Sequence, residues 1–119
     1  MDLERVRDIC RKLPGTTQDI QWGDDLLFCI GNKIYATCCL DPAAPVRLSF
    51  KCTPEEFAEL TERDGIVPAA YVARYCWVSF ECWNALRDQE IERLIRNSYQ
   101  LVRAKLPKKL RGKPARKAR

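Results

Sequence analysis

The strongest pattern of hydrophobic and polar positions in this chain is a strict alternation over residues 46–52. Val46, Leu48, Phe50 and Cys52 are apolar, whereas Arg47, Ser49 and Lys51 between them are polar. Successive side chains of a strand point to opposite faces of a sheet, so the pattern predicts a strand with one buried face and one basic, exposed face. A basic sheet face is suited to phosphate contact, although an ordinary solvent-exposed face has the same pattern.

Two further strand-like runs meet at Gly31-Asn32, and the pattern predicts a β-hairpin there. Glycine supplies the positive φ that a type II′ turn needs at its first central position. The two-residue loop sets a register that pairs Cys29 with Ile34, Leu27 with Ala36 and Phe28 with Tyr35. Lys33, at the hairpin tip, is expected on the same side of the sheet as Arg47 and Lys51.

Three segments have helical patterns. Apolar residues recur at three- and four-residue intervals over residues 3–13 and 91–102, and Asp2 and Asp88 are the expected N-caps. Between these two helices, residues 53–56 have the sequence Thr-Pro-Glu-Glu, which is a capping box with proline at the first helical position. This box predicts the start of a third helix.

The remaining segments complete the predicted fold. Residues 16–25 are expected to form a polar connection, residues 66–74 a turn or short helix, and residues 75–80 the last strand, with Trp77 and Ser79 on one face. We therefore predict a single α+β domain with an N-terminal helix, an antiparallel sheet of four or five strands backed by helices, and a long C-terminal helix. A second core is not expected in 119 residues.

Charge divides the chain into a body and a tail. Eight of the 21 Lys and Arg residues lie in residues 105–119, which contain no acid, so residues 1–104 have 13 basic and 16 acidic residues. The body is therefore about −3 and the tail +8. We expect a folded domain over residues 1–107 and a basic, disordered tail over residues 108–119. Such a tail is either a nucleic-acid-binding arm or a solubilising end.

The residue types of most catalytic and metal sites are missing. The chain has no histidine, and its seven cysteines contain no C-x-x-C pair, so a mixed Cys/His zinc site is excluded and reduced thiols are expected. Glycine-rich phosphate-binding motifs are absent too. No apolar run approaches the roughly 20 residues of a membrane span. The sequence therefore predicts a non-enzymatic cytoplasmic protein that uses no cofactor and no metal.

A set of spaced motifs extends along most of the chain, at residues 13–15, 22–23, 31–36, 47–51, 77–78, 94–99 and 104–107. In combination, over about residues 3–109, they resemble the MmcQ/YjbR family of small bacterial proteins. The resemblance implies an antiparallel α+β fold similar to the double-wing DNA-binding fold, and hence DNA binding. Many family members have a basic residue where this chain has Cys76, so the tail is the expected replacement for that phosphate contact. Ser98 and Tyr99, within the motif at residues 94–99, are expected to pack and hydrogen-bond inside the domain.

The candidate DNA-contact residues follow from this resemblance and from the charge pattern. They are Lys33, Arg47, Ser49, Lys51, Trp77, Lys105, Lys108, Lys109 and Arg111. Because the body is acidic overall, the affinity for DNA should come mainly from the tail and depend little on base sequence. The alternative is a protein-interaction module that docks a partner on an exposed aromatic sheet face formed by Phe28, Tyr35 and Trp77. In either case a monomer is expected.

Overall fold

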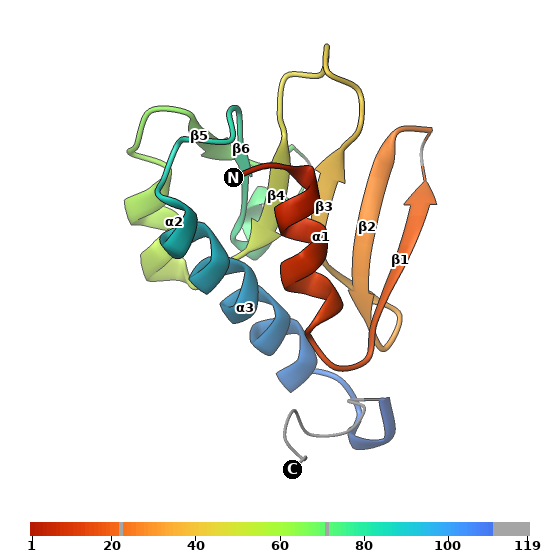
Figure 1. Ribbon diagram of the computed structural model, residues 1–119. Helices are drawn as coiled ribbons and strands as arrows, with labels where there is room; N and C mark the ends of the chain where they lie inside the picture. Colours follow the sequence, from red (N-terminus) through yellow and green to blue (C-terminus); the bar gives the residue numbers. More distant parts are fainter. Residues whose placement is uncertain (22, 71, 111–119) are drawn as a thin grey trace.

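The computed structural model describes residues 1–21, 23–70 and 72–110, in which three α-helices cover one face of a six-stranded antiparallel sheet (Figure 1). The helices are α1 (Leu3–Arg11), α2 (Pro54–Leu60) and α3 (Asp88–Ala104), with single 3₁₀ turns at η1 (Ala73–Tyr75) and η2 (Lys108–Leu110). The strands are β1 (Thr16–Gln21), β2 (Asp25–Ile30), β3 (Lys33–Cys39), β4 (Leu48–Lys51), β5 (Ile66–Pro68) and β6 (Trp77–Phe80). They are arranged in the order β1-β2-β3-β4-β6-β5. One hydrophobic core joins all three helices to the sheet, which confirms the predicted α+β fold.

Both edge strands differ from the prediction. β1 occupies most of the segment expected to be a polar connection, and β5 part of the segment expected to be a turn or short helix. Five of the six β1 residues are exposed, so this strand lacks the apolar alternation by which strands are recognised in a sequence. β5 has three residues and ends in Pro68, which suits an edge because proline cannot donate to a neighbouring strand. The described sheet therefore has six strands instead of four or five.

The central hairpin turns at Gly31-Asn32, as predicted, but its turn type and register differ from the prediction. Both turn residues have positive φ, +55° and +71°, which is the conformation of a type I′ turn and not of a type II′ turn. Cys29 pairs with Ile34 as predicted, whereas Leu27 pairs with Thr37 and Phe28 with Ala36. The register shifts because Tyr35 is the extra residue of a β-bulge, and its side chain is fully buried in the core.

The predicted helix starts are correct for α1 and α2 and wrong for α3. Asp2 accepts a hydrogen bond from the N–H of Arg5 at 2.9 Å, and Thr53 begins α2 with a complete capping box. The N-cap of α3 is Arg87, which makes no side-chain capping bond. Asp88 is the first residue inside the helix, and its carboxylate accepts hydrogen bonds from the N-terminal ammonium of Met1 at 2.7 Å and from Arg5 at 2.5 Å. The contact with Arg5 joins the start of α3 to α1.

A hydrogen-bonded serine ties α3 to the centre of the sheet. Ser98 is fully buried, donates to the carbonyl oxygen of Tyr35 at 2.6 Å and accepts from the N–H of Lys51 at 3.0 Å. Beside it, the Tyr99 ring packs edge-on against Tyr35 with 5.3 Å between ring centroids, and its hydroxyl donates to the carbonyl oxygen of Pro14. These contacts confirm the packing roles expected for Ser98 and Tyr99.

The chain beyond α3 contacts the tip of the hairpin. A Cβ atom placed on Gly31 would lie 2.6 Å from both the Cδ1 atom of Leu106 and the carbonyl oxygen of Leu110. Residues 108–110, the first part of the predicted disordered tail, form η2. The rest of that prediction, for residues 111–119, lies outside the described residues. Within the described ranges, no helix is both long enough and apolar enough to cross a membrane.

Candidate functional site

The face of the sheet opposite the helices carries a row of hydroxyl side chains. The strand register places Thr37 beside Ser49 and Ser49 beside Ser79, on the neighbouring strands β3, β4 and β6. These residues alternate with core residues such as Phe50 and Val78, so their side chains point away from the helices. The hydroxyl oxygens of Ser49 and Ser79 are 2.7 Å apart and share a hydrogen bond.

This row is the floor of a groove of about 600 Å³. At one end of the row, the register brings Asp25, Cys39 and Arg47 together on β2, β3 and the residue that precedes β4. At the other end, Trp77 lies two residues from Ser79 along β6 and is partly exposed. The groove therefore changes from charged, through hydroxyl-lined, to apolar along its length.

The segment between β5 and β6 supplies the apolar wall of this groove. Ala69, Ala70 and Val72 line it, and the N–H of Ala69 donates to the carbonyl oxygen of Trp77 at 3.0 Å. Sequence reasoning missed this wall. Residues 69–72 include no charged residue and no residue typical of turns, and they do not follow the spacing of a helix or a strand. Such an apolar run is the sequence signal that would have indicated the wall.

The two cations of the outer sheet face are held by backbone carbonyl groups. Arg47 donates from Nη2 to the carbonyl oxygens of Asp41 and Ala44, at 2.8 and 2.7 Å. The Nζ atom of Lys51 donates to the carbonyl oxygen of Tyr75 at 2.8 Å. These acceptors are neutral, so they position the cations without cancelling their charges. The predicted alternation of Arg47 and Lys51 with core residues is confirmed.

A second cluster of predicted residues lies where the hairpin tip meets the C-terminal segment. We call it the basic end, and it consists of Lys33, Lys105, Lys108 and Lys109. All four lysines are exposed. Residues 26–40 and 93–110, which build this end, contain no acidic residue. The segments that build the basic end therefore carry positive charge and no negative charge of their own.

The structure thus places eight of the nine candidate DNA-contact residues, in two groups. Four of them, Arg47, Ser49, Lys51 and Trp77, belong to the outer sheet face, and the basic end contains four more. Lys33 pairs with Ile30, a core residue, so the expectation that it shares the face of Arg47 and Lys51 is wrong. The bulge at the hairpin is the cause, because it reverses the alternation before residue 35. Arg111 lies outside the described residues.

The aromatic face on which the alternative interpretation depended does not form. Phe28 and Tyr35 are both fully buried against the helices, whereas Trp77 is on the outer face. The expectation of an exposed aromatic patch made of these three residues is therefore wrong. The physical reason is that Phe28 and Tyr35 both face the helices, whereas Trp77 pairs with Lys51 and lies on the opposite face of the sheet.

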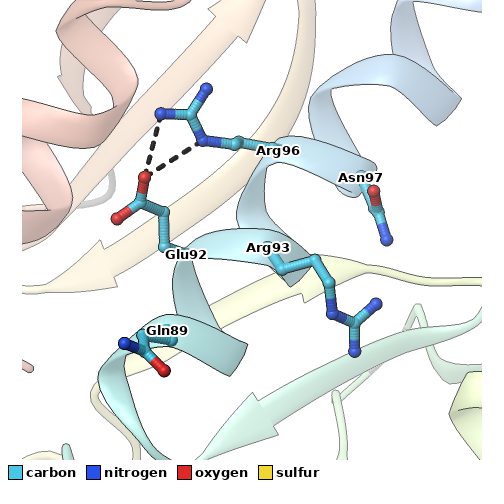
Figure 2. A pocket seen from close by; sticks show the side chains of 5 residues that line it. All are labelled: Gln89, Glu92, Arg93, Arg96 and Asn97. Carbon is cyan, nitrogen blue, oxygen red and sulfur yellow. Dashed lines mark hydrogen bonds and ion pairs between the residues drawn. The ribbon is translucent and has the colours of Figure 1, made fainter.

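The exposed side of α3 has a shallow depression whose charges are already paired (Figure 2). Figure 2 shows Glu92 and Arg96 directed toward each other, one helical turn apart, with Nη2 of Arg96 2.9 Å from the carboxylate. Arg93 points the other way and lies 3.6 Å from the carboxylate of Glu56 on α2. Ion pairs of this exposed kind are typical of a solvated helix surface.

The buried cysteines behave as small core residues. Burial raises the pKa of the Cys10 thiol to about 12 and that of the Cys52 thiol to about 12, and it raises the pKa of Cys38 as well. A nucleophilic or metal-binding cysteine needs the opposite shift, toward the thiolate. In residues 1–21, 23–70 and 72–110, no group of three Cys, Asp or Glu side chains could hold a metal ion.

Comparison with known proteins identifies the family. The model of the YjbR family matches residues 11–101, which is most of the chain. The protein belongs to the YjbR family. This finding confirms the family to which the spaced motifs pointed. A search among curated proteins finds no match.

Two solved structures share the fold. The Deinococcus radiodurans protein DR2400, described by the family domain DUF419, is 27% identical with a TM-score of 0.81, over 92% of this chain and 85% of that chain. A Pseudomonas syringae protein is also 27% identical, with a TM-score of 0.70, over 85% of this chain and 98% of that chain. Their descriptions name no ligand or reaction, so the function has to be argued from the surfaces described above.

Proposed function

We propose that this YjbR protein binds DNA through the phosphate backbone, with the basic end as the main contact surface, and that it does so without catalysis. The observation that supports this proposal is the meeting of two acid-free segments, the hairpin tip and residues 105–110, which gather four exposed lysines. Residues 111–119 add five further basic residues in sequence. Flexible, exposed ammonium groups of this kind bind phosphates mainly as point charges.

The contacts of the basic end are to phosphate and not to base edges. Lysine clusters without aromatic or amide side chains position a protein on DNA but carry little sequence information. The acidic charge of the rest of the domain opposes binding elsewhere on the surface. Binding is therefore expected to be weakly sequence-dependent and strongly salt-dependent.

The proposal also places the protein in the cytoplasm and treats it as a monomer. All seven cysteines are free, which suits the reducing environment of the cytoplasm. We expect the protein to bind as a monomer, and light scattering of the complex with a short duplex measures the stoichiometry directly. A dimer on the duplex would contradict this part of the proposal.

The test is a salt series of fluorescence anisotropy with a labelled duplex and the full chain. The main variant replaces Lys105, Lys108 and Lys109 with Gln. The matched control replaces three exposed arginines with Gln in the same way, at positions remote from the basic end in sequence: Arg63, Arg74 and Arg87. Both variants lose three positive charges. We expect the main variant to reduce the slope of log K against log[salt] by about 2 to 3, and the control to change it by less than about 1.

Two outcomes would overturn the proposal. The first is equal loss of slope in the two variants, because only net charge would then matter. The second is a wild-type chain that does not bind the duplex even at low salt.

A further inference from the structure

The groove on the outer sheet face is separate from the basic end, and its floor has unused hydrogen-bonding capacity. Ser79 is only 5% exposed, yet within the described residues its hydroxyl bonds only to Ser49. Two hydroxyl groups have two hydrogens, and their mutual bond uses one of them. The second hydrogen is available to an acceptor inside the groove. Ser79 is satisfied by Ser49, so the second hydrogen is spare donor capacity for a group bound in the groove and not an unsatisfied buried group.

The charged end of the groove carries one group of each sign. Asp25 and Arg47 lie on either side of Cys39, which is on the strand between them. Their backbones are therefore two strand spacings, roughly 10 Å, apart. In the described part of the chain, the Asp25 carboxylate has no ion-pair or hydrogen-bond partner. Arg47 uses Nη2 for the loop carbonyls, which leaves Nε and Nη1 for another acceptor.

The opposite end of the groove is apolar. Trp77 and Ile34 lie there on the outer face, and Ala69 and Val72 form the wall next to them. An indole ring beside small aliphatic side chains favours an apolar or ring-containing group, because both surfaces lose contact with water.

We propose that this groove binds a small zwitterion with an apolar body, of the size and chemistry of an apolar dipeptide. Its ammonium group would face Asp25, its carboxylate would accept from Arg47 and from the Ser49–Ser79 hydroxyl pair, and its side chains would pack on Trp77. The cavity of about 600 Å³ is within the range of small-molecule sites. A simple anion or cation would leave one of the two charged side chains without a partner.

The same features disfavour a nucleic-acid backbone in the groove. A phosphate at Arg47 would leave the Asp25 carboxylate at the same end of the groove without a counter-charge, whereas the ammonium group of a zwitterion supplies one. The inference is therefore independent of DNA binding at the basic end, and either can fail without the other.

The test is an NMR titration of the ¹⁵N-labelled full chain with three matched probes. They are leucyl-phenylalanine, its N-acetyl form, which lacks the ammonium group, and its C-terminal amide, which lacks the carboxylate. We expect saturable shifts of the backbone amides of Thr37, Ser49 and Ser79 and of the Trp77 indole with the free dipeptide. Each modified probe should bind about tenfold more weakly, as expected for loss of one charge-assisted contact.

Two variants assign each end of the probe. Asp25→Asn should abolish only the preference for the free dipeptide over its N-acetyl form. Arg47→Gln should abolish only the preference for the free dipeptide over its C-terminal amide. The control Asp64→Asn, at an exposed position outside the groove, should keep both preferences. Both groove residues are partly exposed, and a dispersed spectrum of each variant verifies the fold.

The proposal would be overturned by probes that bind equally well, by shifts confined to the helices, or by no saturable shift at probe concentrations of about 10 mM. Because the comparison of the three probes uses the unmodified protein, it decides the question even if a variant does not fold.

Discussion

Two buried serines on opposite faces of the same sheet show how similar residues take different roles. On the helix side, Ser98 both donates and accepts, to Tyr35 and from Lys51, so its hydrogen bonds belong to the fold. On the outer side, Ser79 has one partner, Ser49, in the described residues, and it lines a groove. Burial alone therefore does not distinguish a hydroxyl group that holds the fold together from one that can bind a ligand. The number of hydrogen bonds that the hydroxyl group leaves unused does distinguish them.

The largest expected effect is on the packing beside Ser98. Tyr99→Ala removes a ring that is 2% exposed and packs edge-on against Tyr35, so we expect a loss of about 3–5 kcal/mol in the free energy of unfolding. Trp77→Ala, on the partly exposed outer face, should cost less than half as much. Urea denaturation followed by circular dichroism measures both values. Similar losses for the two variants would show that the outer face is also part of the core.

The second effect concerns the two serines directly. Ser98→Ala leaves the carbonyl of Tyr35 and the N–H of Lys51 without their partner, so it should destabilise the fold by about 1–3 kcal/mol. Ser79→Ala should cost less than about 1 kcal/mol, since Ser49 can turn its hydroxyl to water in the open groove. The same denaturation assay compares them. A reversed order would contradict the distinction between the two hydroxyl groups.

The smallest effect is expected for the two cations of the outer face. A variant with both Arg47→Ala and Lys51→Ala should keep the fold, with a loss of less than about 1 kcal/mol, because both side chains lie on the polar face of the sheet and bond to backbone carbonyls. Circular dichroism and the urea midpoint test this expectation. Unfolding of the variant would mean that these residues hold the loops in place and are not free for recognition.

Local patterns predicted the parts of the fold that local physics controls. The alternation in β4, the Gly31-Asn32 turn, and the starts of α1 and α2 at Asp2 and Thr53 each depend on a few neighbouring residues. β1 was missed because its polar side chains are exposed at the sheet edge and are held there by pairing with β2, which no local pattern reports. Asp88 was misassigned because its partners, the N-terminal ammonium of Met1 and Arg5, are distant in the chain.

The candidate site was harder to predict than the fold. The residue types of the outer face were predicted, but the groove needs Asp25, Arg47 and Trp77 from three separate segments, and these meet only through the strand register. The basic end was predicted as part of a tail, whereas its link to Lys33 depends on the contact between Gly31 and Leu110. One bulged residue, Tyr35, decided the face of Lys33.

The glycine at the hairpin tip limits how relatives of this chain can vary. Hairpin tips usually tolerate insertions and substitutions. Here any side chain at position 31 would need a left-handed backbone and would meet the carbonyl oxygen of Leu110, so the tip and residues 106–110 cannot change independently. Relatives with a longer hairpin or a bulkier tip residue should therefore also lack the C-terminal contact, and would have to carry their positive charge elsewhere on the domain.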